Sequence, residues 1–207
     1  MEENLAILIA DLSGYTALTE THGSTAAADL IDKYLQIVQV CLVGDSKLHE
    51  RTGDEVMIVS SSADAILSTT LMIGKNMSNE ENFLQVHGGL HYGNVLKRAN
   101  NYFGSTINLT SRIAAQASPG KFWCSAEYVN ALADKSVVAF ESKGNHLFKN
   151  ISEEIGIYEL QTKNVSTFYI DPVCRMLILD RQNAIPHPDE DEIYFCSSVC
   201  LSIYNTK

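Results

Sequence analysis

The chain has 207 residues, of which 45% are hydrophobic and 19% charged, and its formal net charge is −10. This composition is globular, and the length accommodates one domain of about 150 residues with a small second unit. The negative charge and the lack of a basic stripe argue against a nucleic acid partner. Apolar runs fall short of the roughly 20 residues that span a bilayer, and the start lacks the basic segment of a secretory signal. We therefore expect a cytoplasmic protein without a membrane span.

The N-terminal part combines a short apolar run with a longer amphipathic segment. Residues 5–10 are continuously apolar and have the length of a buried strand, which the turn-forming sequence Asp11-Leu-Ser-Gly14 ends. Asp11 is therefore expected just past a strand end. Over residues 25–43 apolar side chains recur at three- and four-residue spacing, which predicts an amphipathic helix.

A hairpin and a second helix are predicted next. Residues 47–51 and 55–60 resemble strands, and Thr52-Gly-Asp54 between them has the composition of a tight hairpin. Asp54 is thus expected at the hairpin tip. Apolar spacing predicts a helix over 63–77.

The following part continues with short elements. We expect a strand over 83–92, then a helix over 104–117 that Ser118-Pro-Gly120 ends. Further short strands are predicted over 122–125, 137–141, 146–149 and 155–160. Strands and helices alternate here without a regular βαβ rhythm, which predicts an α+β fold with helices on one face of a sheet.

The composition changes near residue 162. Residues 161–166 are polar and lack periodicity, and three of the four prolines and three of the five cysteines come after them. We place a domain boundary there, so that residues 1–162 and 163–207 form separate units.

Two acidic residues are expected on adjacent strands of one sheet, where their side chains could converge. Asp11 follows one strand and Asp54 tips a hairpin of what would be adjacent strands. Paired carboxylates of this kind bind Mg²⁺, whose shell is completed by water and phosphate oxygens. Two such ions stabilise both oxygens of an in-line displacement. The alternative is that each Asp only turns the chain, as Asp beside Gly commonly does.

Four motifs resemble those of class III adenylyl and guanylyl cyclases and occur in that family's order. They are Ile9-Ala-Asp-Leu-Ser-Gly-Tyr-Thr16, Thr52-Gly-Asp-Glu-Val-Met57, Tyr102-Phe-Gly-Ser-Thr-Ile-Asn-Leu-Thr-Ser-Arg112, and His146-Leu-Phe-Lys149 with Ile157-Tyr-Glu-Leu160. The resemblance covers residues 5 to about 160. It implies a ferredoxin-like cyclase homology domain with an antiparallel-rich sheet, which acts as a homodimer on a purine nucleoside triphosphate.

The resemblance also implies a role for each motif residue. Asp11 and Asp54 would hold two Mg²⁺ or Mn²⁺ ions. Asn108 would orient the ribose from the other protomer, while Arg112 and Lys149 would neutralise charge on the phosphates. Asn108 and Arg112 are four residues apart and so share one helix face.

The resemblance further assigns base recognition to Glu50 and Asn101. A carboxylate accepts from both N1–H and the exocyclic amine of guanine, so Glu50 favours GTP over ATP. Asn101 matches neither the aspartate of adenylyl cyclases nor the cysteine of guanylyl cyclases. Its amide both donates and accepts, so Asn101 suits either purine.

The C-terminal cysteines form a separate motif. Asp171-Pro-Val-Cys-Arg-Met176 and Ile193-Tyr-Phe-Cys-Ser-Ser-Val-Cys200 resemble the YHS domain, a TRASH-like metal module. This resemblance implies a second metal site at Cys174, Cys196 and Cys200, and three thiolates suit Zn²⁺ or Cu⁺. His187 or Asp171 is available as a fourth ligand, and buried structural thiols are the alternative.

The sequence therefore predicts a homodimeric nucleotide cyclase with a metal-sensing tail. The competing interpretation is a catalytically inactive cyclase-fold module that binds a nucleotide or a metal and regulates.

Overall fold

The computed structural model describes residues 1–136, 138–161, 169–174, 177–178, 182 and 184–206. The central sheet contains β1 (Glu2–Ser13), β2 (Lys47–Thr52), β3 (Glu55–Ser60), β4 (Gln85–Arg98), β5 (Asn101–Phe103), β6 (Phe122–Ser125), β7 (Ala139–His146) and β8 (Ile155–Gln161). Its helices are α1 (Tyr15–Cys41), α2 (Ala63–Ser78), α3 (Ser105–Ala114) and α4 (Ala126–Ala131).

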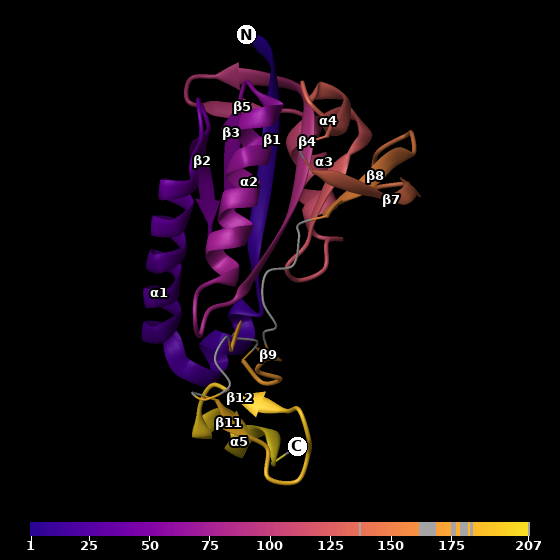
Figure 1. The fold of residues 1–207 in the computed structure, drawn as a ribbon. Coiled ribbons are helices and arrows are strands. Elements are labelled where there is room, and N and C mark those ends of the chain that lie inside the picture. The colour runs from indigo at the N-terminus through magenta and orange to yellow at the C-terminus, as the bar shows by residue number, and fades with distance from the viewer. Residues whose placement is uncertain (137, 162–168, 175–176, 179–181, 183, 207) are drawn as a thin grey trace.

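The sheet has the strand order β2-β3-β1-β4-β6-β8-β7, and β5 pairs with β4 (Figure 1). Its pairs are antiparallel except for β4 and β6, which run parallel. The predicted α+β fold with an antiparallel-rich sheet is thereby confirmed.

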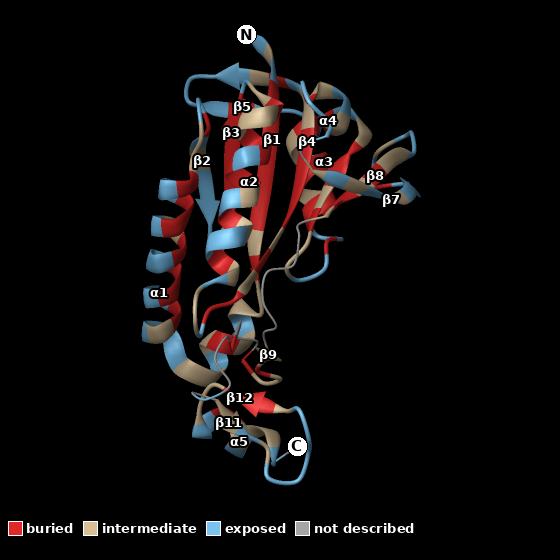
Figure 2. Ribbon diagram, in the orientation of Figure 1, coloured by how far each residue is buried: buried red, intermediate tan, exposed pale blue. Residues whose placement is uncertain are grey.

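Helices cover both faces of this sheet, whereas one face was predicted. Alternate side chains of β1 point to opposite faces. Ala6, Leu8 and Ala10 join the larger core beneath α1 and α2. Leu5, Ile7 and Ile9 join a second cluster that includes Ala114 of α3. Figure 2 shows buried residues throughout the central strands and along the inner side of α1. The pattern along β1 is continuously apolar because both its faces are covered.

The first helix begins ten residues earlier than the predicted start at residue 25. It runs from Tyr15 to Cys41, with a kink at Gly23, where φ is 84° and ψ is 168°. An L-residue rarely adopts this backbone, so glycine is needed there. The sequence pattern shows only the longer, regular segment after the kink. The short segment before it buries a single side chain, Leu18.

Two other predictions are corrected by long-range pairing. Asp11 lies within β1, not past its end, because β1 pairs with β4 as far as Ser13 opposite Gln85. The predicted strand over 146–149 does not form, since β7 ends at His146 and Lys149 lies in a turn. The predicted strand over 137–141 begins in the structure at Ala139, and residue 137 lies outside the described residues.

The C-terminal part is small and lies beside the start of α1 (Figure 1). It consists of β9 (Tyr169–Ile170) paired with β10 (Leu177–Ile178), β11 (Ile185–Pro186) paired with β12 (Tyr194–Phe195), and α5 (Ser198–Tyr204). Its buried centre is Cys174, Phe195 and Cys200. The predicted boundary between residues 162 and 163 lies outside the described residues. None of the helices in the described ranges has the length and apolar character that crossing a membrane requires.

Candidate active site

Two carboxyl groups meet at the end of the central hairpin. Asp11 projects from β1 and Asp54 from the turn between β2 and β3, and their side chains share a hydrogen bond. The Leu12 amide also donates to Asp11 Oδ1 at 3.0 Å. The structure thus brings together the two acids that the sequence singled out. Both remain partly accessible to solvent.

The electrostatic surroundings of this pair are unfavourable to two negative charges. Burial and the neighbouring Asp11 raise the pKa of Asp54 to about 6, and burial also raises the pKa of Asp11. Glu55 adds a third carboxyl whose pKa is raised by burial and by Asp54. Among the described residues, no Lys or Arg forms an ion pair with any of the three. A divalent cation would supply the missing positive charge, so these residues fit a metal site.

Two further side chains, buried Tyr34 and partly buried His87, lie close to the acids. Tyr34 of α1 is fully buried, and its hydroxyl donates to the Ala10 carbonyl at 3.4 Å. Burial and the nearby acids raise the pKa of Tyr34 well above its usual value, so it stays a neutral donor. His87 of β4 lies opposite Asp11 and pairs with the Ser13 hydroxyl at 2.9 Å. Burial lowers the pKa of His87, so this histidine does not provide a permanent counter-charge at neutral pH.

A bulge in β2 places Glu50 on the face of the sheet that α3 occupies. Leu48 pairs with Ile58, but the register then shifts so that Glu50 pairs with Met57. Because a shift of one residue reverses the face of each side chain, Glu50 lies on the side of Met57 and not of the core under α1. Ordinary alternation would have turned Glu50 towards that core.

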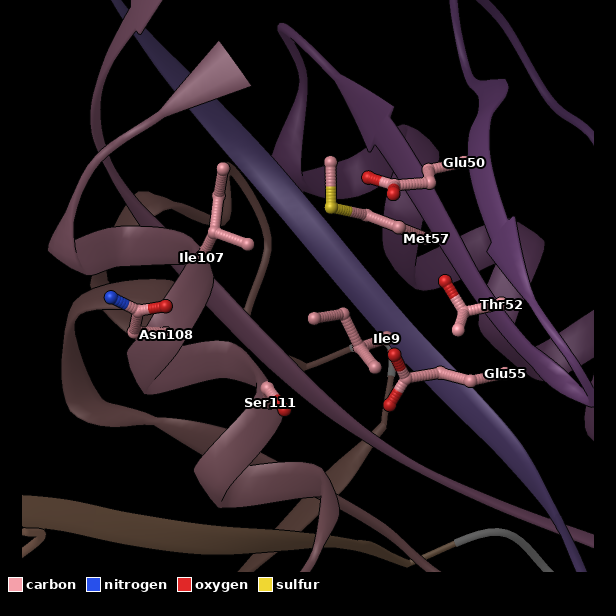
Figure 3. Close-up of a pocket in the computed structure, with 8 residues that line it drawn as sticks. All are labelled: Ile9, Glu50, Thr52, Glu55, Met57, Ile107, Asn108 and Ser111. Carbon is pink, nitrogen blue, oxygen red and sulfur yellow. The ribbon is translucent and has the colours of Figure 1, made fainter. Parts of the chain in front are cut away.

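Glu50 and Asn108 line one pocket of about 190 Å³. Figure 3 shows α3 on one side of it and the β2–β3 hairpin on the other, with Ile9 of β1 between them. The other lining residues are Thr52, Glu55, Met57, Ile107 and Ser111. Thr52, Glu55 and Ser111 were not among the predicted site residues, although Thr52 and Glu55 flank the Gly-Asp turn.

Helix α3 packs closely on β4 and carries the Asn and Arg of the third motif. A Cβ atom on Gly89 would lie 2.4 Å from the Ala114 nitrogen and 2.6 Å from the Thr110 carbonyl oxygen, so only glycine permits this approach. Asn108 is exposed and Arg112 partly exposed. Arg112 has no ion pair or hydrogen bond to another described side chain.

The remaining predicted site residues lie at the periphery. Lys149 is exposed in the turn after Phe148, and Phe148 packs against Leu109 and Ile113 of α3. This packing keeps Lys149 beside α3. Asn101 is exposed at the start of β5, paired with Arg98, and does not line the pocket of Glu50.

The three C-terminal cysteines also converge. Cys196 Sγ lies 3.5 Å from Cys174 Sγ and 3.7 Å from Cys200 Sγ, and none of the cysteines forms a disulfide. The histidine beside them is His22 of α1, which the sequence did not indicate. Of the two predicted fourth ligands, His187 instead pairs with Asn205 at 2.9 Å. Asp171 accepts backbone hydrogen bonds from Val173, Cys174 and Cys196.

Comparison with known proteins agrees with the fold and identifies the family. The family model of the adenylate and guanylate cyclase catalytic domain matches residues 1–171. An uncharacterized protein of Mycobacterium tuberculosis is 33% identical over 131 residues, which are 63% of this chain and 35% of that protein. An adenylate cyclase of Glutamicibacter nicotianae is 28% identical over 128 residues, 61% of this chain and 32% of that protein. The chain thus spans about a third of the length of these relatives.

A solved structure shows the same fold. One of the adenylate cyclases from Trypanosoma brucei, analysed in the monomeric state, superposes with a TM-score of 0.71 and 17% identity, covering 86% of this chain and 94% of that one. Fold and site together define an α+β domain with a paired-carboxylate centre. The chain belongs to the adenylate and guanylate cyclase catalytic domain family.

Proposed function

We propose that this protein is a nucleotide cyclase that converts a purine nucleoside triphosphate into a 3′,5′-cyclic nucleotide and pyrophosphate. The observation that carries the proposal is the contact between Asp11 and Asp54 without a basic partner among the described residues. Two Mg²⁺ or Mn²⁺ ions held there would act as Lewis acids on the attacking 3′-oxygen and the phosphates.

The residues of the chain supply position and charge in this reaction. The 3′-oxygen attacks the α-phosphorus, the bond to the bridging oxygen breaks so that pyrophosphate leaves, and the 3′-hydroxyl proton passes to solvent water. Such a displacement needs little covalent help from a protein. Asn108 would orient the ribose, and Arg112 and Lys149 would neutralise charge on the phosphate oxygens.

Two observations support a homodimer with shared sites. The pocket of about 190 Å³ in one chain is smaller than the roughly 300–1,000 Å³ of typical ligand pockets, which supports a second subunit enclosing the nucleotide. Arg112 and Lys149 also have no acidic partner within the described chain. We propose that each site combines Asp11 and Asp54 of one protomer with Asn108, Arg112 and Lys149 of the other.

Glu50 supports GTP as the preferred substrate. Its carboxylate lies on the pocket face, where it can accept two hydrogen bonds from guanine. The resemblance makes Asn101 the second base reader, and it is exposed at the start of β5, outside the pocket that Glu50 lines. The relative named adenylate cyclase shares 28% identity with this chain, so its substrate does not decide the question.

We also propose that residues 163–207 form a YHS-like metal-binding module. The convergence of Cys174, Cys196 and Cys200 supports this assignment. Thiols of this kind survive in a reducing compartment, which supports a cytoplasmic location.

Mixing two inactive variants tests the shared site. Asp54→Asn and Arg112→Ala should each abolish product formation from GTP and Mn²⁺, measured by mass spectrometry. Random exchange of equal amounts makes half of the dimers heterodimers, and each heterodimer has one intact site, so about a quarter of wild-type activity should return.

An active wild type whose variants fail to complement would contradict the shared site. A wild type that binds GTP but forms no cyclic product from any of four nucleotides would favour an inactive regulatory module.

A further inference from the structure

The C-terminal cysteines meet a histidine from the cyclase domain. His22 Nε2 lies 3.5 Å from Cys200 Sγ and 3.8 Å from Cys196 Sγ. The four candidate ligand atoms of His22, Cys174, Cys196 and Cys200 all lie within 4.8 Å of one another. Cys174 and Cys200 are fully buried, while His22 and Cys196 are partly exposed.

Four of the six spacings between these atoms match the edges of a tetrahedron around zinc. Zn–S bonds of about 2.3 Å and Zn–N bonds of about 2.0–2.1 Å give tetrahedral edges of about 3.8 Å between sulfurs and about 3.5 Å between sulfur and nitrogen. The four distances given above run from 3.5 to 3.8 Å, and the two pairs of Cys174 Sγ with Cys200 Sγ and His22 Nε2 lie within 4.8 Å. A disulfide would instead require a separation of about 2.05 Å.

The backbone around the cysteines is held in place by a buried carboxylate. Asp171 is fully buried, and its two oxygens accept amides from both ligand-bearing segments, Cys174 at 3.1 Å and Cys196 at 2.8 Å. Ser197 caps α5 by accepting the Cys200 amide at 3.3 Å. Outer-shell hydrogen bonds of this kind orient metal ligands. They also leave Asp171 without a role as a ligand.

The C-terminal part has little else to hold it together. Its described buried apolar side chains are only Cys174, Ile178, Tyr194, Phe195 and Cys200, with six partly buried neighbours, and its paired strands are two residues long. Units of this size usually need a metal or a disulfide for stability.

We propose that His22 completes a closed Zn²⁺ site with Cys174, Cys196 and Cys200, so that one ion fastens the C-terminal part to helix α1 of the cyclase domain. Three thiolates and one imidazole fill a tetrahedral shell without an open position, which is the pattern of structural zinc. The site is distinct from the acid pair, and it stands whether or not the protein turns over a nucleotide.

Metal content and affinity give the first test. Protein purified anaerobically with reductant should hold about one Zn²⁺ per chain, and Co²⁺ substitution should give the visible bands of a tetrahedral thiolate site. Removing a ligand should weaken Zn²⁺ binding against a competing chelator about 10-fold or more in His22→Ala and alter the Co²⁺ spectrum. His187→Ala is the matched control, because His187 lies in the same part but bonds to Asn205, and it should change neither.

Hydrogen exchange gives a second test that does not depend on the tail folding in every variant. In buffer without Mg²⁺ or Mn²⁺, stripping Zn²⁺ from the wild type should speed exchange in residues 15–22 as well as in 194–204. In His22→Ala, zinc removal should affect only the C-terminal residues. Any of three results would overturn the proposal. They are purified wild-type protein that holds no zinc, zinc binding that is unchanged in His22→Ala, and a rate of exchange in residues 15–22 of the wild type that does not change when zinc is removed.

Discussion

Replacing Asp54 by Asn should stabilise the metal-free protein while abolishing its activity. The pKa of Asp54 is raised from 3.8 to about 6, chiefly by burial and by Asp11. Forcing it to ionise at pH 8 therefore opposes folding. A pKa that is higher by about 2 corresponds to about 3 kcal/mol in the free energy of unfolding. The Asp54 side chain is only half-buried, so solvent screening reduces this to about 1–2 kcal/mol. The Asn amide keeps the shape and donates a hydrogen bond to Asp11.

Removing a side-chain contact usually lowers the free energy of unfolding, whereas Asp54→Asn is expected to raise it. Because the folded-state pKa lies above the unfolded value, the shared proton stabilises the wild type fully below about pH 4 and this contribution is lost as pH rises through about 6. The gain in the variant should therefore appear above pH 6 and vanish near pH 4. Thermal unfolding in chelator measures it, at about 2–4 °C for each kcal/mol.

Metal addition and a second Asp provide the controls. Mn²⁺ should stabilise the wild type but not Asp54→Asn, since the variant lacks one of the two proposed ligands. Asp45 accepts hydrogen bonds from Ser60 and Ser61, which lower its pKa to about 2, so Asp45→Asn should instead reduce stability at pH 8. Destabilisation of the metal-free protein by Asp54→Asn, or an effect equal at pH 4 and pH 8, would refute the argument.

Two further substitutions test other parts of the site. Gly89→Ala should lower the free energy of unfolding by about 3 kcal/mol, measured by urea titration, because its Cβ would collide with the backbone of α3; a loss below 1 kcal/mol would show that α3 tolerates displacement. Glu50→Lys should lower kcat/KM for GTP by about 10- to 100-fold relative to ATP, since it removes a charged acceptor; an unchanged GTP/ATP ratio would exclude Glu50 from base recognition.

Local patterns were sufficient for much of the fold and for the residues of the acid pair. The apolar run of β1, the hairpin around Asp54 and the spacing in α2 each depend on neighbours in sequence. The limits of elements depend on distant partners instead. The strand β1 continues past Asp11 because β4 pairs with it. Phe148 packs against α3 instead of continuing the predicted strand, and Lys149 therefore lies in a turn.

The orientation of Glu50 shows a second kind of limit. Motif spacing indicates that this residue belongs to the hairpin before Asp54, but the face on which it lies depends on a one-residue bulge between Leu48 and Glu50. Nothing in the local sequence around His49, such as a glycine, predicts that bulge. It follows from pairing with β3, where Ile58 and Met57 must face opposite layers.

His22 marks the point where spacing arguments fail altogether. Cys196 directly precedes the N-cap Ser197 of α5 and Cys200 lies in the first turn of that helix, so their proximity follows from local geometry even though they do not share the helix face that their spacing predicts. His22 lies more than 150 residues before Cys174, in the short segment that Gly23 separates from the regular part of α1. That segment has one buried residue, Leu18, so amphipathic spacing could not reveal it. Asp11 and His22 are thus only 11 residues apart in sequence, yet their partners are distant in sequence. Asp11 meets Asp54 through sheet pairing, and His22 meets the three cysteines through the packing of the C-terminal part beside α1.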